Sequence, residues 1–361
     1  MPILYFTVTN DISYDQRMQR ICSTLADAGY TVTLVGRKFP SSKPLPSFSF
    51  NTKRLKCFFQ KGKLFYAEYN FRLFIYLLSK KMDGICAIDL DTILPCYYIS
   101  ILKKIPRIYD AHELFCEMKE IVSRPAVYRW WKKIEKKTVP AFIHGYTVNR
   151  PIADEFRNMY GVEYEVIRNI PKSEAFTTNT PGNYLLYQGD VNEGRAFETL
   201  IPAMKNINMP LWIAGDGNFL EQAKELTRKH GLENKIVFKG KIPPPQLKEL
   251  TRNAFAGFTL FESGAMSNYY SLANRFFDYM HAGLPQVCVN YPVYEEINTT
   301  YPVAILINNV ESSTIAGAVN SLLENPDLWN TLHTNALEAS KVLNWQNEQL
   351  KLIAFYRKIY G

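Results

Sequence analysis

The chain has 361 residues, of which 47% are hydrophobic and 21% are charged, and its formal net charge is +8 at pH 7. This length exceeds a single typical core and predicts two domains, and the apolar content excludes a largely disordered chain. No apolar run reaches the roughly 18 residues that a membrane span needs, and no secretory signal precedes the first predicted strand. We therefore expect a cytoplasmic protein that is soluble or lies peripherally on the inner face of the cytoplasmic membrane.

The net charge and the spacing of the cysteines indicate which kinds of partner and site the protein can have. A basic protein favours acidic partners such as phosphorylated substrates or anionic lipid. The basic residues are not interleaved with an exposed aromatic sheet pattern, so a nucleic-acid partner is disfavoured. The six cysteines show no CxxC spacing, which predicts reduced thiols and neither a disulfide framework nor a metal site.

Strand-like and helix-like segments alternate along the first half of the chain, which predicts an α/β fold with a parallel sheet. Apolar strands are predicted at 3–8, 31–35, 84–88, 107–109, 145–148 and 164–167. Helices are predicted at 14–29, 93–103 and 152–160.

A polar, turn-rich stretch at 171–182 is the predicted linker, and the alternation resumes after it. Strands are predicted at 184–188, 211–214, 235–238, 257–261 and 286–289, with helices at 196–204, 219–230 and 244–252, a helix that begins near 274, and a long helical region at 324–360. The chain therefore divides into two doubly wound, Rossmann-like domains, 1–170 and 171–345. We expect a C-terminal helix at 346–361 to pack back on the first domain.

The most informative segment is 268–285, which places a polar, aromatic turn before a helix that opens with Asn274 and Arg275. A helix start offers free N–H groups and a positive dipole end, and an arginine adds a fork of donors, which suits a diphosphate. Asp278, one turn further, is placed to accept hydrogen bonds from a ribose diol. This segment predicts a sugar-nucleotide pocket.

Two other loops follow predicted strands at the same sheet edge. The loop 189–195 ends in Arg195, a second phosphate candidate whose alternative is a solvated surface arginine. The turn Gly215-Asp-Gly217 precedes a helix, and its glycines alternatively serve backbone geometry alone.

In the first half, Asn10, Asp11 and Arg17 follow the first strand, and we expect them to reach the ligand; Asp15 there is more simply a helix cap. His112 and Glu113 end the strand that begins at residue 107, where α/β sites form. Asp89 and Asp91 have the same position after strand 84–88, with helix capping as the alternative.

Together these motifs resemble the nucleotide-binding domain of retaining, family 4 glycosyltransferases with the GT-B fold. The resemblance follows the chain in order through 188–195, 214–217, 238–242 and 274–285. It implies two Rossmann-like domains facing across a cleft, with the acceptor on the first and a UDP- or GDP-linked sugar on the second. His112 matches the family's acceptor-side histidine, Arg195 the lysine of its Arg-Lys diphosphate pair, and Asp278 its ribose-binding glutamate. The donor-binding residues so implied are Gly217, Ile242, Tyr270, Ser271, Leu272, Asn274 and Asp278.

The chain departs from the family at two positions. Tyr270 stands where the family has a sugar-binding glutamate, eight residues before Asp278. Asp190 occupies the position of the first diphosphate arginine, and Arg275 with Asn274 is predicted to replace that lost charge. The segment 268–272, Asn-Tyr-Tyr-Ser-Leu, is similar to a subgroup that has this segment before its Asn-Lys/Arg pair.

The resemblance implies sugar transfer to a saccharide or lipid-linked saccharide with retention, in surface polysaccharide or glycoconjugate synthesis, without metal or cofactor. His112, Arg195 and Arg275 are its implied catalytic residues. Two alternatives stay open: a sugar-nucleotide epimerase or hydrolase of the same fold, and an inactive nucleotide-sugar-binding, membrane-associated protein. A dinucleotide-dependent oxidoreductase is disfavoured because no GxGxxG follows the first strand.

Trp130 and Trp131 lie among Arg129, Lys132, Lys133, Lys136 and Lys137. This pattern predicts either an amphipathic helix with both tryptophans in the core, or an interfacial helix with both indoles among anionic headgroups. The second interpretation favours a lipid-linked acceptor.

Overall fold

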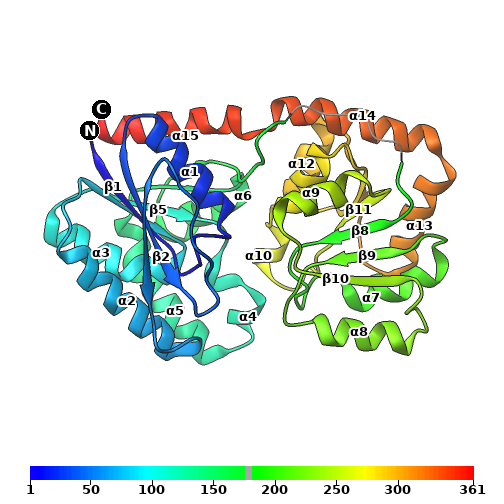
Figure 1. Cartoon of the computed structure of the whole chain (residues 1–361), viewed down its shortest axis with the longest axis horizontal. Coiled ribbons are helices and arrows are strands. Elements are labelled where there is room, and N and C mark those ends of the chain that lie inside the picture. The colour runs from blue at the N-terminus through cyan, green and yellow to red at the C-terminus, as the bar shows by residue number, and fades with distance from the viewer. Residues whose placement is uncertain (175–180) are drawn as a thin grey trace. The chain divides into compact units, whose positions relative to one another are not determined.

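The computed structural model describes residues 1–174 and 181–361. They form two compact units, one of Met1–Asn169 with Glu348–Gly361 and one of Ile170–Asn347. The predicted boundaries fall after residues 170 and 345. Part of the predicted linker, 175–180, lies outside the described residues. Each unit is a parallel sheet covered by helices, and the predicted α/β fold class is confirmed (Figure 1).

The first unit contains a seven-stranded sheet with the order β3-β2-β1-β4-β5-β6-β7. Its strands are β1 (Ile3–Thr7), β2 (Thr31–Lys38), β3 (Asn51–Lys56), β4 (Gly84–Ile88), β5 (Arg107–Ala111), β6 (His144–Thr147) and β7 (Glu165–Val166). Its helices are α1 (Gln16–Asp27), α2 (Gly62–Leu78), α3 (Ile93–Lys103), α4 (Lys119–Val122), α5 (Pro125–Thr138), α6 (Arg150–Tyr160) and most of α15 (Trp345–Tyr360).

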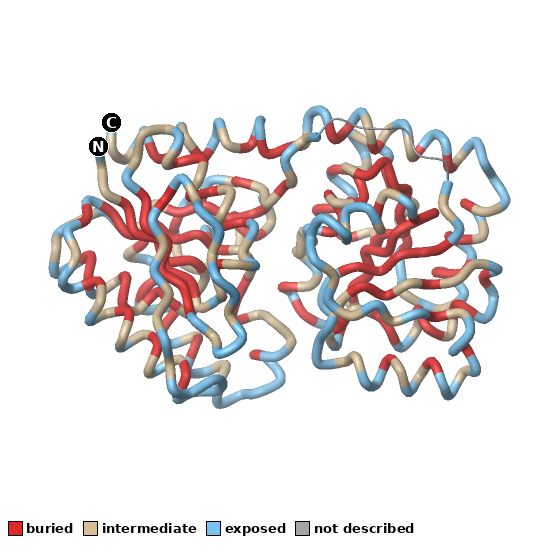
Figure 2. The backbone as a smooth tube through the Cα atoms, viewed as in Figure 1, coloured by how far each residue is buried: buried red, intermediate tan, exposed pale blue. Residues whose placement is uncertain are grey.

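Alternate side chains of these strands face opposite helix layers. Phe6 of β1 packs against Tyr356 of α15, whereas its neighbour Tyr5 packs against Tyr76 of α2. Helices α1 and α15 therefore cover one face of the sheet, and α2, α3 and α5 cover the other (Figure 1). The buried backbone follows the strands between these layers (Figure 2).

The second unit contains a six-stranded sheet with the order β10-β9-β8-β11-β12-β13. Its strands are β8 (Leu185–Gln188), β9 (Leu211–Ala214), β10 (Ile236–Gly240), β11 (Ala256–Thr259), β12 (Gln286–Val289) and β13 (Ala304–Ile307). Its helices are α7 (Phe197–Ala203), α8 (Leu220–Lys229), α9 (Pro244–Arg252), α10 (Met266–Tyr269), α11 (Asn274–His281), α12 (Pro292–Thr300), α13 (Ser312–Glu324) and α14 (Pro326–Val342).

Both sheets reverse their strand order at one point, between β1 and β4 in the first unit and between β8 and β11 in the second. Ligands of doubly wound sheets bind beyond the carboxyl ends of the strands at such a point. The loops after these four strands are therefore where a site is expected in each unit. No helix among the described residues combines the length and the hydropathy needed to span a bilayer.

Candidate functional site

The loops after β8 and β9 in the second unit interlock through glycines. A Cβ at Gly215 would lie 1.8 Å from the carbonyl oxygen of Gly189, and one at Gly217 would lie 2.4 Å from that of Val191. Gly189 itself has a φ of 118°, which favours glycine. Gly217, a predicted donor-binding residue, thus has a visible role in bringing the two loops together.

Arg275, on the first turn of α11, is a buried cation at the switch point. Its side chain is only 7% exposed, and Nη1 donates to the hydroxyl of Tyr187 at 2.8 Å and to the carbonyl of Gln188 at 3.2 Å. Burial acts to lower the pKa of Arg275, but the surrounding tyrosine oxygens raise it overall. Within the described part of the chain, Nε and Nη2 have no hydrogen-bond partner and no carboxylate pairs with this guanidinium.

Arg195 reaches the same place from the loop after β8. Its guanidinium carbon lies 4.5 Å from the centroid of the Phe261 ring, and that of Arg275 lies 4.9 Å from the same centroid. Nη1 of Arg195 donates to the side-chain oxygen of Asn268 at 3.0 Å. The fold therefore brings the two predicted phosphate-binding arginines together on one aromatic ring.

Asp278 lies one turn along α11 from Arg275 and is held by a short polar chain. Its Oδ2 accepts a hydrogen bond from Nε2 of Gln188 at 3.0 Å, and Oε1 of Gln188 accepts one from the hydroxyl of Thr251 at 2.6 Å. Gln188, at the end of β8, is buried, whereas Asp278 is half-buried. Gln188 thus orients a carboxylate that solvent or a ligand can still reach.

The remaining predicted donor residues line the approach to α11. The hydroxyl of Ser271 lies 3.3 Å from that of Tyr294, and Leu272 packs against the main core cluster. These two residues anchor the loop. Asn274 is exposed at the start of α11, and the ring of Tyr270 lies 5.3 Å from that of Tyr269.

Two other positions near this sheet edge bear on the predicted donor site. Ile242, after β10, packs against the smaller core cluster around Tyr279. Asp190, which stands where the family has an arginine, is exposed, and its carbonyl accepts the hydroxyl of Tyr187 at 2.8 Å.

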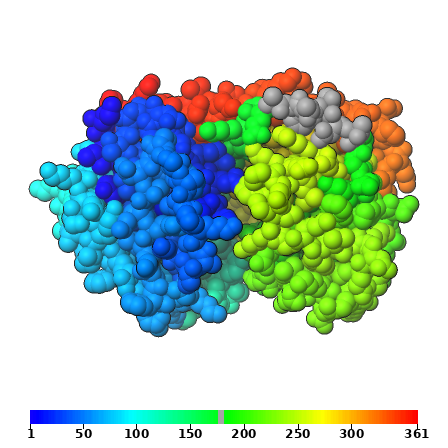
Figure 3. All heavy atoms as spheres, viewed as in Figure 1, coloured from blue at the N-terminus to red at the C-terminus, as the bar shows by residue number. Residues whose placement is uncertain are grey.

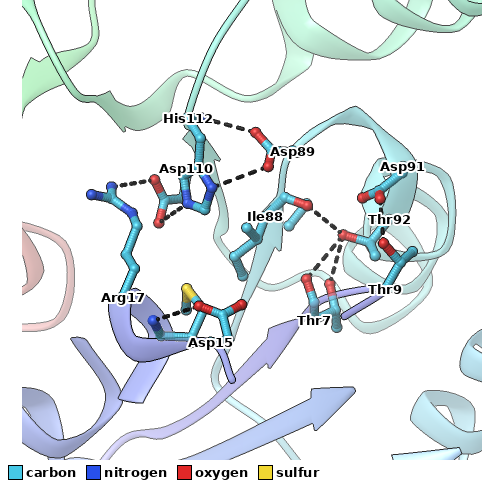
Figure 4. Close-up of polar contacts among 12 residues, drawn as sticks. Thr7, Thr9, Asp15, Arg17, Ile88, Asp89, Asp91, Thr92, Asp110 and His112 are labelled. Carbon is cyan, nitrogen blue, oxygen red and sulfur yellow. Dashed lines mark hydrogen bonds and ion pairs between the residues drawn. The ribbon is translucent and has the colours of Figure 1, made fainter. Parts of the chain in front are cut away.

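In the first unit, His112 lies between two carboxylates beyond the end of β5 (Figure 4). Its Nδ1 is 3.1 Å from Oδ2 of Asp89, and its Nε2 is 3.4 Å from Oδ2 of Asp110. Burial lowers the pKa of His112, but Asp89 and Asp110 more than offset this and raise it to about 10. The imidazole is therefore protonated at neutral pH.

Asp110 also binds Arg17, and sequence reasoning missed Asp110 as a site residue. Nη2 of Arg17 lies 2.7 Å from Oδ1 of Asp110, and both side chains are buried. Burial acts to raise the pKa of Asp110, but Arg17 and His112 lower it overall. The expectation that Arg17 reaches a ligand is corrected, because this buried ion pair occupies it. The simpler prediction for Asp15 is confirmed, since its carboxylate caps α1 through the Met18 N–H at 3.0 Å.

Asp89 has a φ of 54°, an uncommon conformation for a residue other than glycine. Its carboxylate accepts the backbone N–H of His112 at 2.9 Å besides pairing with the imidazole, which fixes this conformation. Asp91 accepts a hydrogen bond from the hydroxyl of Thr9, and burial together with the charge of Asp89 raises the pKa of Asp91 to about 7. Strained residues of this kind gather at functional sites.

The other predicted acceptor-side residues lie in nearby loops. Asp11 accepts hydrogen bonds from Ser13 and lies 3.4 Å from Arg54, so it holds its own turn. Asn10 is exposed, and its carbonyl accepts the backbone N–H of Arg37 at 2.9 Å. Glu113 is half-buried directly after His112.

Each of the two predicted alternatives for Trp130 and Trp131 is wrong for one tryptophan, because one indole is in the core and the other is exposed. Trp131 is a core residue whose ring contacts Tyr66 and Phe115, whereas Trp130 is half exposed. Lys132 forms ion pairs with Glu117 and Glu135 inside the unit. Neighbouring positions on a helix point about 100° apart, so both indoles could not face the same environment.

Within residues 1–174 and 181–361, no three His, Cys, Asp or Glu side chains are grouped as a metal-binding cluster. The cationic groups at the second-unit site are the two guanidinium groups, and the start of α11 adds a positive dipole end. That helix has no side-chain N-cap hydrogen bond. Such an arrangement suits an anion with several oxygens.

Comparison with known proteins agrees with this geometry. Residues 170–339 match the sequence model of the family described as glycosyl transferases group 1. No curated protein sequence matches the chain.

Several solved structures share the fold over the whole chain. Sucrose-phosphate synthase from Thermosynechococcus elongatus has a TM-score of 0.80 at 16% identity, covering 100% of this chain and 99% of that chain. HepE from Anabaena, solved with UDP-glucose, has a TM-score of 0.76 at 13% identity, covering 99% and 100%. WaaG, a glycosyltransferase involved in lipopolysaccharide biosynthesis, has a TM-score of 0.68 at 15% identity, also covering 99% and 100%. The match to the group 1 glycosyl transferases thus covers most of the second unit, and the two Rossmann-like domains have the GT-B fold, as the sequence resemblance predicts.

Proposed function

We propose that the chain transfers a sugar from a nucleoside diphosphate to a hydroxyl of a saccharide or lipid-linked saccharide, with retention of anomeric configuration. The observation that carries this proposal is Arg275, a buried guanidinium with two unpartnered nitrogens among the described residues, beside Arg195.

An unpaired buried cation is costly, because desolvation removes water that no counter-charge replaces. A diphosphate would supply that charge and would accept hydrogen bonds from Nε and Nη2 of Arg275. Its oxygens would also meet the N–H groups at the start of α11, where the helix dipole favours an anion. Arg195, stacked on the same Phe261 ring, would neutralise the second phosphate.

The nucleoside is proposed to lie along the same sheet edge. Asp278, oriented by Gln188, is placed to accept the ribose hydroxyls. Uridine is the first candidate base, since the structures similar in fold include HepE with UDP and with UDP-glucose, and guanosine is the second. Asn274 and Tyr270 are proposed to contact the donor sugar, and Tyr270 in place of a glutamate is proposed to alter which sugar is preferred.

The proposed reaction breaks the bond between the anomeric carbon and the diphosphate oxygen and forms one to the acceptor oxygen. Arg195 and Arg275 stabilise the charge that grows on the leaving diphosphate, so the proposal needs no metal ion. The acceptor proton goes to the departing diphosphate oxygen. His112 is not the base in this scheme, because its raised pKa keeps it protonated at neutral pH. We propose instead that His112 donates a hydrogen bond to the reacting sugar.

The acceptor is proposed to be bound by the first unit, in the cytoplasm, during synthesis of a surface polysaccharide or glycoconjugate. The similarity in fold to WaaG, of lipopolysaccharide biosynthesis, supports this class of product. Glu113 and the loop at Asn10 and Asp11 remain the candidate acceptor contacts.

Thermal unfolding with uridine, guanosine and adenosine diphosphates tests the donor site. One base should stabilise the protein strongly, by about 2.7 kcal/mol at a hundredfold excess over Kd. Arg275→Met should weaken this binding by about 10- to 100-fold, since a charge-assisted hydrogen bond contributes about 1.5–3 kcal/mol. The matched control is Arg228→Met, an exposed arginine on α8, which should bind as the parent does.

Equal affinity of the Arg275→Met and Arg228→Met variants would overturn the donor site. Incubation with a labelled sugar nucleotide and a membrane extract then separates the activities. Label in a new glycoconjugate supports transfer, whereas free sugar or an isomerised donor would identify the hydrolase or epimerase alternative.

A further inference from the structure

Helix α2 of the first unit is apolar on two sides. Phe65, Tyr69, Leu73 and Leu77 are buried against the sheet. On the other side Leu64, Phe71, Ile75 and Leu78 are 59%, 66%, 51% and 45% exposed. Their spacing of seven, four and three residues places them in one stripe along the helix. A surface helix normally has one apolar side, which faces the core, so the second, exposed apolar stripe of α2 indicates a partner.

The stripe continues onto α3 and α5. Tyr98, Ile101 and Leu102 of α3 are exposed, and Nζ of Lys103 donates to the carbonyl of Leu78 at 3.0 Å, which joins α3 to the end of α2. Nζ of Lys137 donates to the hydroxyl of Tyr98 at 3.0 Å, which joins α5 to α3.

On α5, Trp130, Lys133 and Lys137 lie on one side at helical spacing, and Trp130 is 52% exposed. We call this surface the outer face; its apolar members are Leu64, Phe71, Ile75, Leu78, Tyr98, Ile101, Leu102 and Trp130. Atoms of α2 and α3, in blue to cyan, reach the surface of the first unit in Figure 3.

Basic side chains surround the outer face. The exposed ones on and beside α2, α3 and α5 are Lys61, Lys63, Lys81, Lys104, Arg124, Arg129, Lys133, Lys136 and Lys137, against the exposed acids Asp83 and Glu120 beside them. These three helices contain two acidic residues, and both are already occupied. Glu68 pairs with Arg72 at 2.7 Å, and the buried Glu135 pairs with Lys132 at 2.7 Å. The outer face is therefore apolar in its centre and positive around it.

We propose that the outer face binds an anionic lipid bilayer, with the apolar side chains between the headgroups and the lysines at the lipid phosphates. The many exposed lysines favour a bilayer over a protein partner. Lysine is depleted where proteins bind one another and favoured where proteins meet anionic lipid. The inference goes beyond the proposed function, since it requires neither donor binding nor sugar transfer. Of the two tryptophans in the interfacial alternative only Trp130 belongs to this face, together with the stripe of α2.

Co-sedimentation with vesicles of phosphatidylglycerol and phosphatidylcholine in equal parts tests the proposal. The protein should bind these vesicles, and Ile75→Glu should weaken binding by about tenfold or more, because it removes one inserted side chain and adds a repelled charge. The matched control is Leu350→Glu. Leu350 is 62% exposed, but it lies on α15, which covers the opposite face of the sheet, so this variant should bind as the parent does.

Two double variants test how much the charges of the lysines contribute to vesicle binding. Lys133→Glu with Lys136→Glu should weaken binding by about tenfold or more. Arg228→Glu with Lys229→Glu, exposed residues of α8 in the second unit, should not change it. Binding should fall with added salt and be weak on pure phosphatidylcholine.

Three results would overturn the proposal: equal binding by Ile75→Glu and Leu350→Glu, equal binding to pure phosphatidylcholine, or no vesicle binding by the parent protein. A parent that is dimeric without lipid and that Ile75→Glu makes monomeric would assign the outer face to a second copy of the chain instead. Nucleoside diphosphate binding, measured on the same variants, confirms that each is folded and keeps this outcome separate from that of the donor site.

Discussion

Two buried arginines of this protein have opposite electrostatic surroundings. Arg17 and Arg275 are 5% and 7% exposed, yet only Arg17 has a carboxylate partner, Asp110, at 2.7 Å. Removing one member of a buried ion pair destabilises the fold because the other charge is stranded, whereas an unpaired buried charge strands nothing when it is removed. Arg17 is thus paired within the fold, whereas Arg275 is the arginine that we propose to bind the diphosphate.

The comparison leads to a prediction for the unliganded protein. Arg17→Met should lower the free energy of unfolding by about 3–5 kcal/mol, because it leaves Asp110 buried beside His112 alone. Arg275→Met should cost less than about 1 kcal/mol, since no counter-charge is stranded. Denaturant unfolding of both variants measures these losses. A larger loss of stability for Arg275→Met than for Arg17→Met would contradict the proposed ligand-binding role of Arg275.

His112 is predicted to act on the reaction rather than on donor binding. His112→Ala should lower kcat by about 10²–10³-fold, the range for loss of one preorganised hydrogen-bond donor in the transition state. The Kd for the nucleoside diphosphate should stay within a factor of two or so, because the proposed diphosphate contacts come from the second unit. Steady-state kinetics and calorimetry together measure this, and unchanged turnover would remove His112 from the site.

The raised pKa of His112 also predicts a pH dependence of stability. The pKa in the fold, about 10, lies above the value of about 6.5 for an unperturbed histidine, so the folded state binds the proton more tightly. The stability that this provides is complete below pH 6.5 or so and is lost as the pH rises toward 10. The difference in unfolding free energy between the parent and His112→Gln should therefore shrink over this range. A constant difference would mean that the imidazole is neutral.

At the scale of elements, the helix α15 is joined to the first unit by aromatic packing. Tyr356 is fully buried, and its ring contacts those of Phe6, Tyr30 and Tyr146. The ring of Tyr360 lies so close to Gly84 that a Cβ there would be 1.7 Å from its hydroxyl. The C-terminal helix is thus part of the core around β1 and β6.

Removing a buried aromatic ring from α15 should weaken its packing against the first unit. Tyr356→Ala should destabilise the first unit by about 3–5 kcal/mol, the usual cost of removing a buried aromatic ring. Leu350→Ala, on the exposed side of the same helix, should change stability by less than about 0.5 kcal/mol. Chemical denaturation measures both variants, and similar values for the two would show that α15 is not docked.

Helices and strands that a short sequence pattern identifies could be predicted from the sequence. Helices α3 and α9 and strand β9 begin and end where the spacing of apolar residues and prolines indicates. Strand β3 was missed because it is an edge strand rich in lysine and arginine, recognisable only by its pairing with β2. Helix α2 was missed because apolar residues on two sides obscure the 3.6-residue period that identifies a surface helix.

The candidate site was predictable only in the parts that local motifs identify. Arg195, Arg275 and Asp278 stand in motifs after strands, so their positions at a sheet edge follow from the chain order. Their meeting on Phe261, and the orientation of Asp278 by Gln188, depend on contacts between distant segments that no local pattern encodes. Asp110 was missed for the same reason, because its partners come from α1 and from the strand end at His112.

At the scale of the whole molecule, each unit has its own sheet and its own candidate site. A ligand raises the opening free energy of the cooperative unit to which it binds, and amide exchange reports the opening of such units. A saturating nucleoside diphosphate should therefore slow amide hydrogen exchange in β8, β11 and α11 and leave β1 and β4 unchanged. Exchange detected by mass spectrometry measures this, and protection of β1 and β4 alone would place the donor in the first unit.

The most direct measurement is a crystal structure with the nucleoside diphosphate that thermal unfolding selects. Diphosphate oxygens should lie within about 3 Å of Nε and Nη2 of Arg275, a hydrogen-bonding distance, with Arg195 on the neighbouring phosphate. A diphosphate bound elsewhere, with both nitrogens of Arg275 still lacking an acceptor, would contradict the central claim.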